Sequence, residues 1–380
     1  MKVISIGTDR NLFKDGGSVR DRQIEYGRLF EELHIVVFTK KGFASKVQLS
    51  PNVWVYATNS FSQLTYIRRA VKIAEHIAKD RNLKKTDTLV TVQDPFECGL
   101  VGMKIKKKLG MPLHVQIHTD FLNPFFVQES ILNKIRIGIA RKVLPNADGI
   151  RVVSQKILDS LKGISLASHV KKVVLPIFVD ISKYETAPIT SNLREKYPQF
   201  NFIILMASRL TSEKNIPLAL RAFKQVANTY SKIGLVIVGT GPEKFKLEKL
   251  TRDLNLGNNV VFEGWQSDLA SYYKTAHLFL VTSNFEGYGL TIVEAVAAGC
   301  PVISTDVGIA HDLLQDGISL VCPVGDRKCL VDKISQLIED QGMRMNFAQE
   351  AGLRIKKMMI TDKKVYLEAY KQSFESVFGK

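Results

Sequence analysis

The chain lacks the features that mark several classes of protein. Only four cysteines occur in 380 residues, at Cys98, Cys300, Cys322 and Cys329, and no two have the Cys-x-x-Cys spacing of a metal or redox site. We therefore expect reduced thiols and no metal site. No window approaches the roughly 18 consecutive apolar residues of a membrane span, and the first residues, MKVISIG, have the pattern of a strand rather than of a signal peptide. These absences predict a cytoplasmic protein without a transmembrane helix.

Acidic residues are also scarce relative to basic ones. The chain has 53 Lys and Arg against 37 Asp and Glu, which gives a net charge of +16. Such an excess favours anionic partners, namely nucleotides, phospholipid headgroups or nucleic acid. No zinc-finger spacing, aromatic RNA-binding strand or helix-turn-helix pattern accompanies the charge, so nucleic acid is the least favoured of the three.

What the chain does contain is a regular alternation of short apolar runs and helical segments. Its length exceeds that of a usual single core, and 45% apolar and 24% charged residues are globular values. The predicted strands lie at 3–6, 36–38, 53–57, 89–93, 114–117, 149–153 and 173–175, and again at 202–206, 235–238, 260–262, 278–281 and 301–305. The extended segment 176–184 separates the two series. This pattern predicts an α/β protein with two Rossmann-like doubly wound domains.

The stretch 284–308, NFEGYGLTIVEAVAAGCPVISTDVG, is the strongest candidate for a binding site. Gly287 and Gly289 precede a predicted helix, whose first backbone N–H groups and positive dipole end could bind an anion. Glu286 stands just before this turn and Glu294 about two turns along the helix. Carboxylates are strong acceptors for neighbouring hydroxyl groups, so the combination predicts a sugar nucleotide. The alternative is that both carboxylates are solvated surface charges.

The first half of the chain offers two further candidates. Gly16 and Gly17 follow the first strand at the start of the helix predicted over 18–33, where a backbone without side chains can approach a ligand. His118 and Asp120 follow the strand 114–117, at the edge where open α/β sheets bind ligands. A plain turn and a structural histidine are the alternatives.

A glycine pair in the second half resembles part of a dinucleotide-binding motif. Gly239 and Gly241 follow a strand, and Glu263 ends a later strand where a ribose-binding acid would lie. The third glycine position is occupied by Lys244, however, and the motif is absent from the first strand series. Nicotinamide binding is therefore disfavoured.

The predicted helix 131–144 alternates Ile or Leu with Lys and Arg. A basic amphipathic helix of this kind can lie on an anionic membrane surface. The alternative is a helix that packs on its own sheet and turns a charged face to solvent.

Together these residues resemble those of the retaining GT-B glycosyltransferases of family 4, which build surface glycans from nucleotide sugars. The resemblance extends over nearly the whole chain, and the order and spacing of its motifs are more specific than any single motif. The matching positions are Gly16 and Gly17, His118 with Asp120, Ser154, the linker, Arg209 with Lys214, the turn 239–242, Gly264, and the Glu-x7-Glu pair Glu286 and Glu294.

The resemblance implies how the donor diphosphate is bound. Arg209 and Lys214 would face the diphosphate together with the backbone of Gly289, Leu290 and Thr291. The leaving group gains negative charge as the glycosidic bond breaks, and these groups would stabilise it. No metal ion would be required, and no cofactor other than the nucleotide sugar.

Other positions would bind the rest of the donor. The resemblance implies that Glu294 binds the ribose hydroxyls and that Gly264 and Trp265 bracket the base. Glu286 would bind hydroxyls of the donor sugar, and His118 would lie beside the anomeric carbon. Together with Arg209 and Lys214, Glu286 and His118 form the expected catalytic group.

The resemblance also assigns the domains. Residues 1–180 would bind the acceptor, residues 184–361 the nucleotide sugar, and the C-terminal helix within 362–380 would pack back on the first domain. Gly16 and Gly17 would let the backbone approach the donor phosphates or the acceptor, and Asp120 would lie on the acceptor side.

Three positions depart from the family pattern. Ser208 replaces the glycine that often precedes the phosphate-binding Arg, and Ile177-Phe178 replaces Asn-Gly in the linker. Residues 308–312, GIAHD, replace a Gly-Gly-x-x-Glu motif. The last departure concerns the loop on the donor side, and with it the identity of the donor sugar.

The sequence therefore predicts a retaining, metal-independent glycosyltransferase. It would move a hexose or N-acetylhexosamine from a UDP- or GDP-linked donor to a glycan or lipid-linked acceptor, on the inner face of the membrane. Two alternatives remain: a sugar-nucleotide epimerase or hydrolase on the same fold, and a non-catalytic nucleotide-sugar binder.

Overall fold

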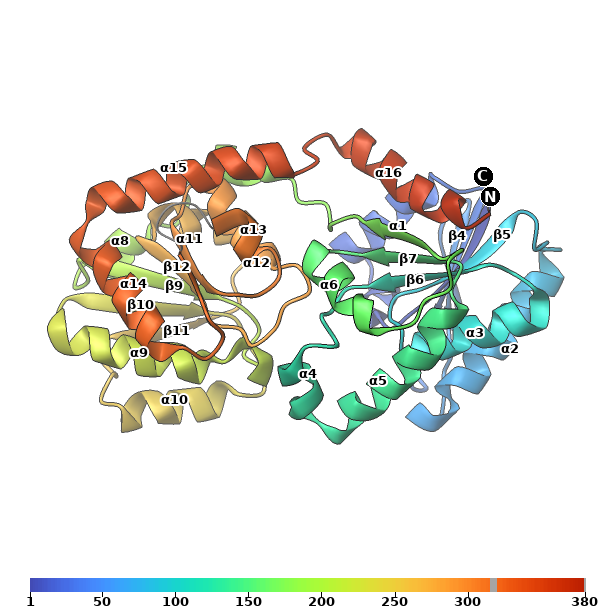
Figure 1. Ribbon diagram of the computed structural model, residues 1–380, viewed down its shortest axis with the longest axis horizontal. Coiled ribbons are helices and arrows are strands. Elements are labelled where there is room, and N and C mark those ends of the chain that lie inside the picture. Colours follow the sequence, from blue (N-terminus) through green and yellow to red (C-terminus); the bar gives the residue numbers. More distant parts are fainter. Residues whose placement is uncertain (315–319, 379–380) are drawn as a thin grey trace. The chain divides into compact units, whose positions relative to one another are not determined.

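The computed structural model describes residues 1–314 and 320–378, and the chain divides into two compact units (Figure 1). Unit 1 consists of Met1–Pro176 together with the segment from Lys364 onward, and unit 2 of Ile177–Lys363. The sequence-based boundary lay a few residues later, at 180–184. Each unit is built on one largely parallel sheet with helices on both faces, so the predicted doubly wound α/β class is confirmed.

Unit 1 contains an eight-stranded sheet in the order β3-β4-β2-β1-β5-β6-β7-β8. The strands are β1 (Lys2–Gly7), β2 (Glu32–Val37), β3 (Lys46–Ser50), β4 (Val53–Ala57), β5 (Thr88–Val92), β6 (Leu113–Ile117), β7 (Gly149–Val152) and β8 (Lys171–Val174). All pairs are parallel except β3 with β4. Strands buried on both faces appear as apolar runs in the sequence. The partly exposed edge strand β3 has no such run, and it was not predicted.

Helices cover both faces of this sheet. They are α1 (Ser18–Gly27), α2 (Tyr66–Asp80), α3 (Glu97–Leu109), α4 (Pro124–Glu129), α5 (Ile131–Val143), α6 (Gln155–Ser160) and the C-terminal α16 (Lys363–Glu375). Figure 1 shows α2, α3 and α5 on one face, with α1 and α16 on the other. The helix predicted over 18–33 is shorter than expected. A Cβ at Gly27 would lie 2.1 Å from Val53 Cγ2, so the end of the helix packs closely on β4.

The C-terminal helix α16 is an integral part of unit 1. The ring of Tyr370 stacks on Tyr26 at 4.6 Å, and Phe374 packs on Phe30 at 5.2 Å between ring centres. Arg151 of β7, only 3% exposed, donates a hydrogen bond to the hydroxyl of Tyr366 at 3.2 Å. Burial of these aromatic rings fixes the helix on the sheet.

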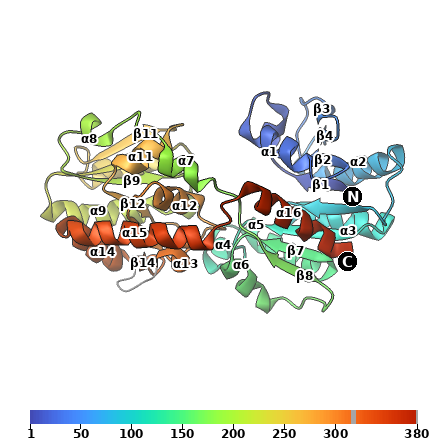
Figure 2. The ribbon, with the colours of Figure 1, turned by 90° about the horizontal axis from the view of Figure 1, so that it is seen from above.

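Unit 2 contains a six-stranded parallel sheet in the order β11-β10-β9-β12-β13-β14. The strands are β9 (Phe202–Ala207), β10 (Ile233–Val238), β11 (Val260–Gly264), β12 (Leu278–Val281), β13 (Val302–Thr305) and β14 (Val321–Cys322). The helices are α7 (Ile181–Thr186), α8 (Leu193–Lys196), α9 (Ile216–Thr229), α10 (Lys244–Asp253), α11 (Leu269–Thr275), α12 (Leu290–Ala297), α13 (Ala310–Leu314), α14 (Arg327–Glu339) and α15 (Gln341–Met358). Figure 2 shows α15 running along this unit.

The segment predicted to be extended over 176–184 is partly helical. Asp180 accepts a hydrogen bond from the backbone N–H of Lys183 at 3.3 Å and thereby caps α7. An aspartate at this position is a strong helix start signal. The expectation of an extended segment as far as Tyr184 is therefore wrong.

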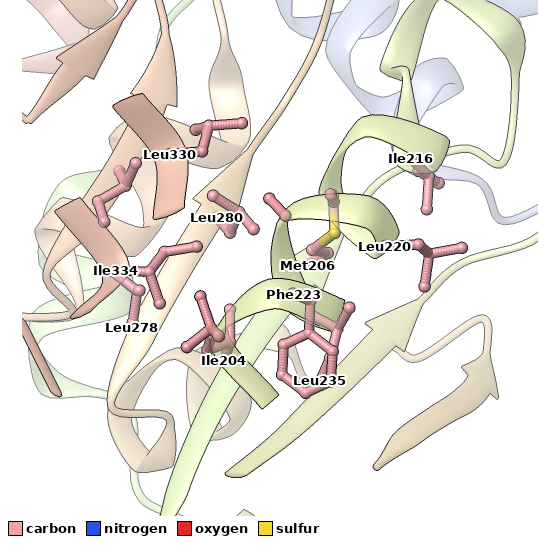
Figure 3. Close-up of a cluster of buried hydrophobic side chains, with 14 of the residues drawn as sticks. Ile204, Met206, Ile216, Leu220, Phe223, Leu235, Leu278, Leu280, Leu330 and Ile334 are labelled. Atoms are coloured by element: carbon pink, nitrogen blue, oxygen red, sulfur yellow. The ribbon is translucent and has the colours of Figure 1, made fainter. Parts of the chain in front are cut away.

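One face of the unit 2 sheet buries an apolar cluster under α9 and α14. Figure 3 shows Ile204 and Leu235 near Phe223 of α9, and Leu278 near Ile334 of α14. Ile204, Phe223 and Leu278 are fully buried. This core holds β9 and β12 in place, and the loops that follow these two strands carry the candidate site.

Two of the four cysteines form a disulfide, so the expectation of four reduced thiols is wrong for this pair. Cys322 ends β14, and Cys329 lies in the first turn of α14, whose capping residue Asp326 accepts from the N–H of Cys329 at 2.9 Å. The short turn between strand and helix brings the two Cα atoms to 5.7 Å, within the range of a disulfide. Cys98 and Cys300 are buried free thiols.

Phe223→Ala tests the contribution of the core of unit 2. Because Phe223 is fully buried, its loss leaves a cavity, and we expect a loss of about 3–5 kcal/mol in the stability of this unit, seen as a lower thermal midpoint. Phe245→Ala is the control because Phe245 is 72% exposed. Equal midpoints for the two variants would contradict the packing described.

Candidate functional site

Hydrogen bonds join two loops of unit 2, which follow the carboxyl ends of β9 and β12. The N–H of Asn284 donates to the carbonyl of Glu213 at 2.8 Å, and the hydroxyl of Thr282 donates to the carbonyl of Lys214 at 3.0 Å. The side-chain amide of Asn215 donates to that of Asn284 at 2.9 Å. These three bonds place Lys214 beside the loop that leads to α12.

Lys214 and Glu286 form an ion pair between these two loops. The Lys214 ammonium donates to Glu286 Oε1 at 2.6 Å, and the hydroxyl of Ser283 donates to the same oxygen at 2.7 Å. The side chains are 14% and 17% exposed, so the pair is largely shielded from water. The other two N–H bonds of Lys214 have no partner among the described residues, and a ligand could use them. The structure thus brings two of the predicted site residues into direct contact.

Arg209 belongs to the same loop, but its guanidinium lies toward solvent. Its side chain is 76% exposed and donates to Glu213 Oε1 at 3.1 Å. The hydroxyl of Thr211 donates to the same carboxylate oxygen at 2.7 Å. The guanidinium can therefore reach a ligand without a buried group being displaced.

The N-terminus of α12 lies next in the chain and offers unused backbone donors. Gly289 has a φ of 93°, a left-handed conformation that glycine adopts readily. Its carbonyl accepts from the N–H groups of Ile292 and Val293. In the part of the chain that the structure describes, the N–H groups of Leu290 and Thr291 have no acceptor. They are the donors that the sequence pattern predicted for an anion.

The segment that departs from the family pattern packs directly on this loop. Gly308 has a φ of 53°, and a Cβ there would lie 2.3 Å from the carbonyl oxygen of Tyr288. The N–H of Ile309 donates to that same oxygen at 2.8 Å. This close approach fixes the backbone between Glu286 and α12.

The carboxylate of Glu294 contacts two tyrosines that were not among the predicted site residues. The hydroxyl of Tyr273 donates to Glu294 Oε2 at 3.1 Å, and Tyr184 also hydrogen-bonds the carboxylate. Burial raises the pKa of Glu294 above its ordinary value, and the two tyrosine hydroxyls partly oppose that rise. Tyr184 lies on α7, in the segment that was expected to be extended. The capping residue Asp180 was the signal that could have revealed this helix.

The turn at Gly239 and Gly241 has a packing role. A Cβ at Gly239 would lie 1.9 Å from the carbonyl oxygen of Ser208, and one at Gly241 would lie 2.3 Å from that of Leu210. Because neither glycine has a side chain, the turn can pack closely against the backbone of the loop that contains Arg209. The dinucleotide-binding interpretation is not needed to explain them.

Glu263 is occupied by structural partners. Its carboxylate pairs with Lys196 at 2.7 Å and accepts from the hydroxyls of Tyr272 and Tyr197. These bonds account for its position at the end of β11 without a ribose.

Gly264 and Trp265 follow β11 at the neighbouring edge of the sheet. The carbonyl of Gly264 accepts from the N–H of Gly239 at 2.6 Å, and a Cβ at Gly264 would meet open space. The ring of Trp265 is 72% exposed. An exposed aromatic ring beside an open backbone is a suitable surface for a base.

In unit 1, Gly16 and Gly17 form an open turn before α1. Gly16 has a φ of 70°, Gly17 is the capping position of the helix, and a Cβ at either would meet nothing within 4 Å. The carbonyl of Gly17 accepts from Arg20 at 2.9 Å. The structure thus leaves the space for a ligand that the sequence pattern suggested.

His118 lies at the end of β6, next to the end of β5. Its Nε2 is 3.2 Å from the side-chain oxygen of Gln93, which can only accept, so Nε2 carries the proton and Nδ1 is an acceptor. Burial, with the charges of Arg151 and Arg22, lowers the pKa of His118 to about 3. The imidazole is therefore neutral at physiological pH.

Asp120 lies two residues further on and is only 5% exposed. Its Oδ2 accepts from the side-chain amide of Asn123 at 3.3 Å, while Oδ1 has no partner in the described structure. Burial raises the pKa of the carboxyl group above its ordinary value. A buried carboxylate oxygen without a partner is a candidate acceptor for a ligand hydroxyl.

The fold agrees with the comparisons with known proteins. Residues 191–354 match the family model of the glycosyl transferases group 1, and they lie within unit 2. The match supports the family resemblance for this region, which is similar to the group 1 glycosyl transferases, and the predicted GT-B fold is confirmed.

Two curated relatives extend the similarity beyond that region. An alpha-monoglucosyldiacylglycerol synthase of Streptococcus pneumoniae is 29% identical over 268 residues, which cover 68% of this chain and 59% of the synthase. An N-acetyl-alpha-D-glucosaminyl L-malate synthase of Bacillus anthracis is 24% identical over 332 residues, which cover 85% of each chain.

Solved structures show the same fold at lower identity. A sucrose-phosphate synthase of Thermosynechococcus elongatus has a TM-score of 0.80 at 20% identity over the whole of both chains. The Anabaena protein HepE, in complex with UDP and glucose, has a TM-score of 0.76 at 20% identity and covers 99% of this chain and 100% of its own.

His118 should remain neutral well below pH 6. Because the unfolded chain binds a proton at this position below about pH 6.5 and the folded chain only near pH 3, the stability conferred by neutral His118 is lost as the pH falls through that window. The imidazole proton signals, assigned with His118→Gln, should not shift between pH 8 and pH 5. A signal of His118 that titrates near pH 6.5 would contradict the buried environment described.

Proposed function

We propose that the chain is a retaining glycosyltransferase that moves a hexose or N-acetylhexosamine from a UDP- or GDP-linked donor to a glycan or lipid-linked acceptor. The observation that carries the proposal is the Lys214–Glu286 pair beside the unused N–H groups of Leu290 and Thr291. Cationic and amide donors for a diphosphate thus stand next to a carboxylate for sugar hydroxyls. The names of the relatives, which include an alpha-monoglucosyldiacylglycerol synthase and a poly(glycerol-phosphate) alpha-glucosyltransferase, agree with the transfer of a hexose.

In this proposal unit 2 binds the donor. Lys214 and Arg209 stabilise the charge that develops on the diphosphate as the bond to the anomeric carbon breaks. These two cations supply the charge that a metal ion provides in other enzymes, so the reaction proceeds without one. Glu286 accepts hydrogen bonds from the hydroxyls of the sugar.

The proposal assigns the remaining donor contacts to the neighbouring candidate residues. Glu294, held by two tyrosine hydroxyls, accepts from the ribose hydroxyls, and Trp265 with the open backbone at Gly264 borders the base. The solved HepE structure contains UDP, which favours a uridine nucleotide over a guanosine nucleotide.

Unit 1 binds the acceptor. Neutral His118 presents a nitrogen that can accept a hydrogen bond from a hydroxyl near the anomeric carbon. Asp120 accepts a hydrogen bond from the acceptor substrate. The open turn at Gly16 and Gly17 lets the backbone of unit 1 approach the donor phosphates or the acceptor substrate. The acceptor hydroxyl attacks the anomeric carbon on the face from which the diphosphate leaves, and its proton passes to a phosphate oxygen. No protein nucleophile takes part.

Lys214→Ala and Glu286→Ala test the proposed donor site. Each should reduce transfer by at least about 100-fold, since each removes a group that contacts the reacting part of the donor. Lys249→Ala is the matched control because it breaks an exposed ion pair with Asp253 on α10. Full transfer by both site variants, with the fold intact, would end this assignment.

Product analysis by NMR distinguishes the transferase from the alternatives. With UDP-glucose, a panel of glycan and lipid acceptors and EDTA, we expect a glycoside with the donor's α configuration and release of UDP. An altered sugar on the nucleotide would identify an epimerase, and free sugar without acceptor a hydrolase. Donor binding without turnover would identify a binder, and activity restored only by a divalent ion would contradict metal independence.

We further propose that the enzyme works at the cytoplasmic face of a membrane and contacts it through α5. Ile131, Leu132 and Ile135 of this helix are 77%, 48% and 56% exposed, and Lys134 beside them is exposed. Apolar side chains flanked by cations suit the surface of an anionic bilayer. Among the described residues, no helix is long and apolar enough to cross the membrane.

Flotation with vesicles tests this contact. The chain should float with vesicles of phosphatidylglycerol and phosphatidylcholine, and Leu132→Glu with Ile135→Glu should abolish flotation because both substitutions place charge on the apolar face. The control pair is Met345→Glu with Leu353→Glu, two residues of α15 that are 64% and 57% exposed. Flotation that is indifferent to phosphatidylglycerol would refute the proposal.

A further inference from the structure

A groove in unit 1 lies apart from every residue assigned above. It has a volume of about 570 Å³ and runs between the antiparallel pair β3–β4 and helix α2, at one edge of the sheet. The candidate residues of unit 1, Gly16, Gly17, His118 and Asp120, do not line it. We refer to it as the β4–α2 groove.

The walls of the groove are strongly basic. Lys46 of β3, Arg69 and Lys72 of α2, and Arg81 after α2 line it, while Asp80 is its one acidic residue. Four fixed positive charges against one negative charge leave a net charge of about +3 in a small concave volume. Such a surface attracts anions strongly, because the walls of a cleft concentrate the field.

These charges are not neutralised by the protein. None of the five residues forms a salt bridge within the described structure. The Lys46 ammonium lies over the ring of Tyr56 at 5.6 Å, and the Arg81 guanidinium lies over Trp54 at 4.3 Å. Contact with aromatic rings orients these two cations without cancelling their charge.

The contrast with the neighbouring helix α3 shows that the lack of partners is local. There Lys106 pairs with Asp148 at 2.7 Å, and Lys108 pairs with Glu75 on the other side of α2. These two basic residues of α3 are thus matched by carboxylates, whereas Lys72 has neither an ion pair nor a hydrogen bond among the described residues. An anionic ligand would supply the missing charge.

One wall of the groove is held rigid by an unusual backbone. Asn59, which lines the groove after β4, has a φ of 43°, a left-handed conformation that few residues other than glycine adopt. Its side chain accepts from the N–H of Phe43 at 3.2 Å and donates to the carbonyl of Phe43 at 2.8 Å. The carbonyl of Asn59 in turn accepts from Arg69, so this guanidinium is positioned before any ligand binds.

We propose that the β4–α2 groove binds a phosphate-bearing ligand. Several cations that line one groove suit an anion with several charged oxygens. The planar guanidinium of Arg69 can donate two parallel hydrogen bonds to a phosphate. Tyr56, Ile73 and Ile77 give the groove an apolar side for the body of the ligand. The inference does not depend on the proposed transferase activity.

The phosphate could belong to a soluble molecule or to a lipid headgroup. Phe61 and Leu64, in the loop from Asn59 to α2, are 75% and 94% exposed. Apolar side chains beside cations would suit a lipid, whereas a concave groove suits a free phosphodiester chain. The experiment therefore uses one probe of each kind.

The test compares two variants with the same change in charge. Lys46→Glu with Lys72→Glu reverses two charges in the groove, and Lys171→Glu with Lys172→Glu reverses two exposed charges on β8, at the opposite edge of the same sheet. The probes are a fluorescent oligomer of glycerol phosphate, followed by anisotropy with inorganic phosphate as competitor, and vesicles with or without phosphatidylglycerol, followed by flotation. Circular dichroism verifies the fold of each variant.

The groove variant should weaken binding of at least one probe by about tenfold or more, and the control by less than about twofold. If the groove variant loses binding of the oligomer, the groove binds a soluble phosphate. If it loses binding only of the phosphatidylglycerol vesicles, the groove binds a lipid headgroup. Equal weakening by both variants would show a general charge effect and overturn the proposal. Failure of the unaltered protein to bind either probe would overturn it as well.

Discussion

The ion pair of Lys214 with Glu286 is the interaction on which the proposed donor site depends. It joins two loops that are 72 residues apart in the chain. The carbonyls of Glu213 and Lys214 accept hydrogen bonds from the N–H of Asn284 and the hydroxyl of Thr282 and so hold those loops together. The apolar core under α9 fixes the strands from which the loops start. A pair shielded in this way keeps its charges at defined positions, so donors for an anion and acceptors for hydroxyls are organised before a substrate binds.

Much of the fold followed from hydrophobic patterning alone. Buried parallel strands such as β4 and β12 stand out because both faces are apolar, and the predicted bounds agree with the structure. Edge strand β3 and the short α7 were missed, because a partly exposed strand lacks an apolar run and a helix of six residues has too few turns to show a period. The ends of helices were less well predicted, as at Gly27, the last residue of α1, which packs closely on Val53.

The residues of the candidate site that belong to one sequence motif could be predicted from the sequence. Those contributed by segments distant in the chain could not. The spacing of Glu286 and Glu294 and the glycine before α12 were visible in the sequence, but the tyrosines around Glu294 come from α7 and α11. Likewise, spacing alone did not reveal the Cys322–Cys329 disulfide or the neutral state of His118, since both depend on how the chain folds back and what it buries. Glu263 shows the reverse case: its position in the sequence suggests a ribose-binding acid, but local partners explain that position.

The central claim is that Lys214 binds the diphosphate of the donor and not its nucleoside. Calorimetry of UDP and of uridine, each with the unaltered protein and with Lys214→Met, measures this coupling directly. The account predicts that the substitution weakens the binding of UDP about tenfold or more and changes the binding of uridine by less than about twofold. The reason is that only UDP carries the charge that Lys214 contacts. An equal loss for both ligands, or none for UDP, would contradict it.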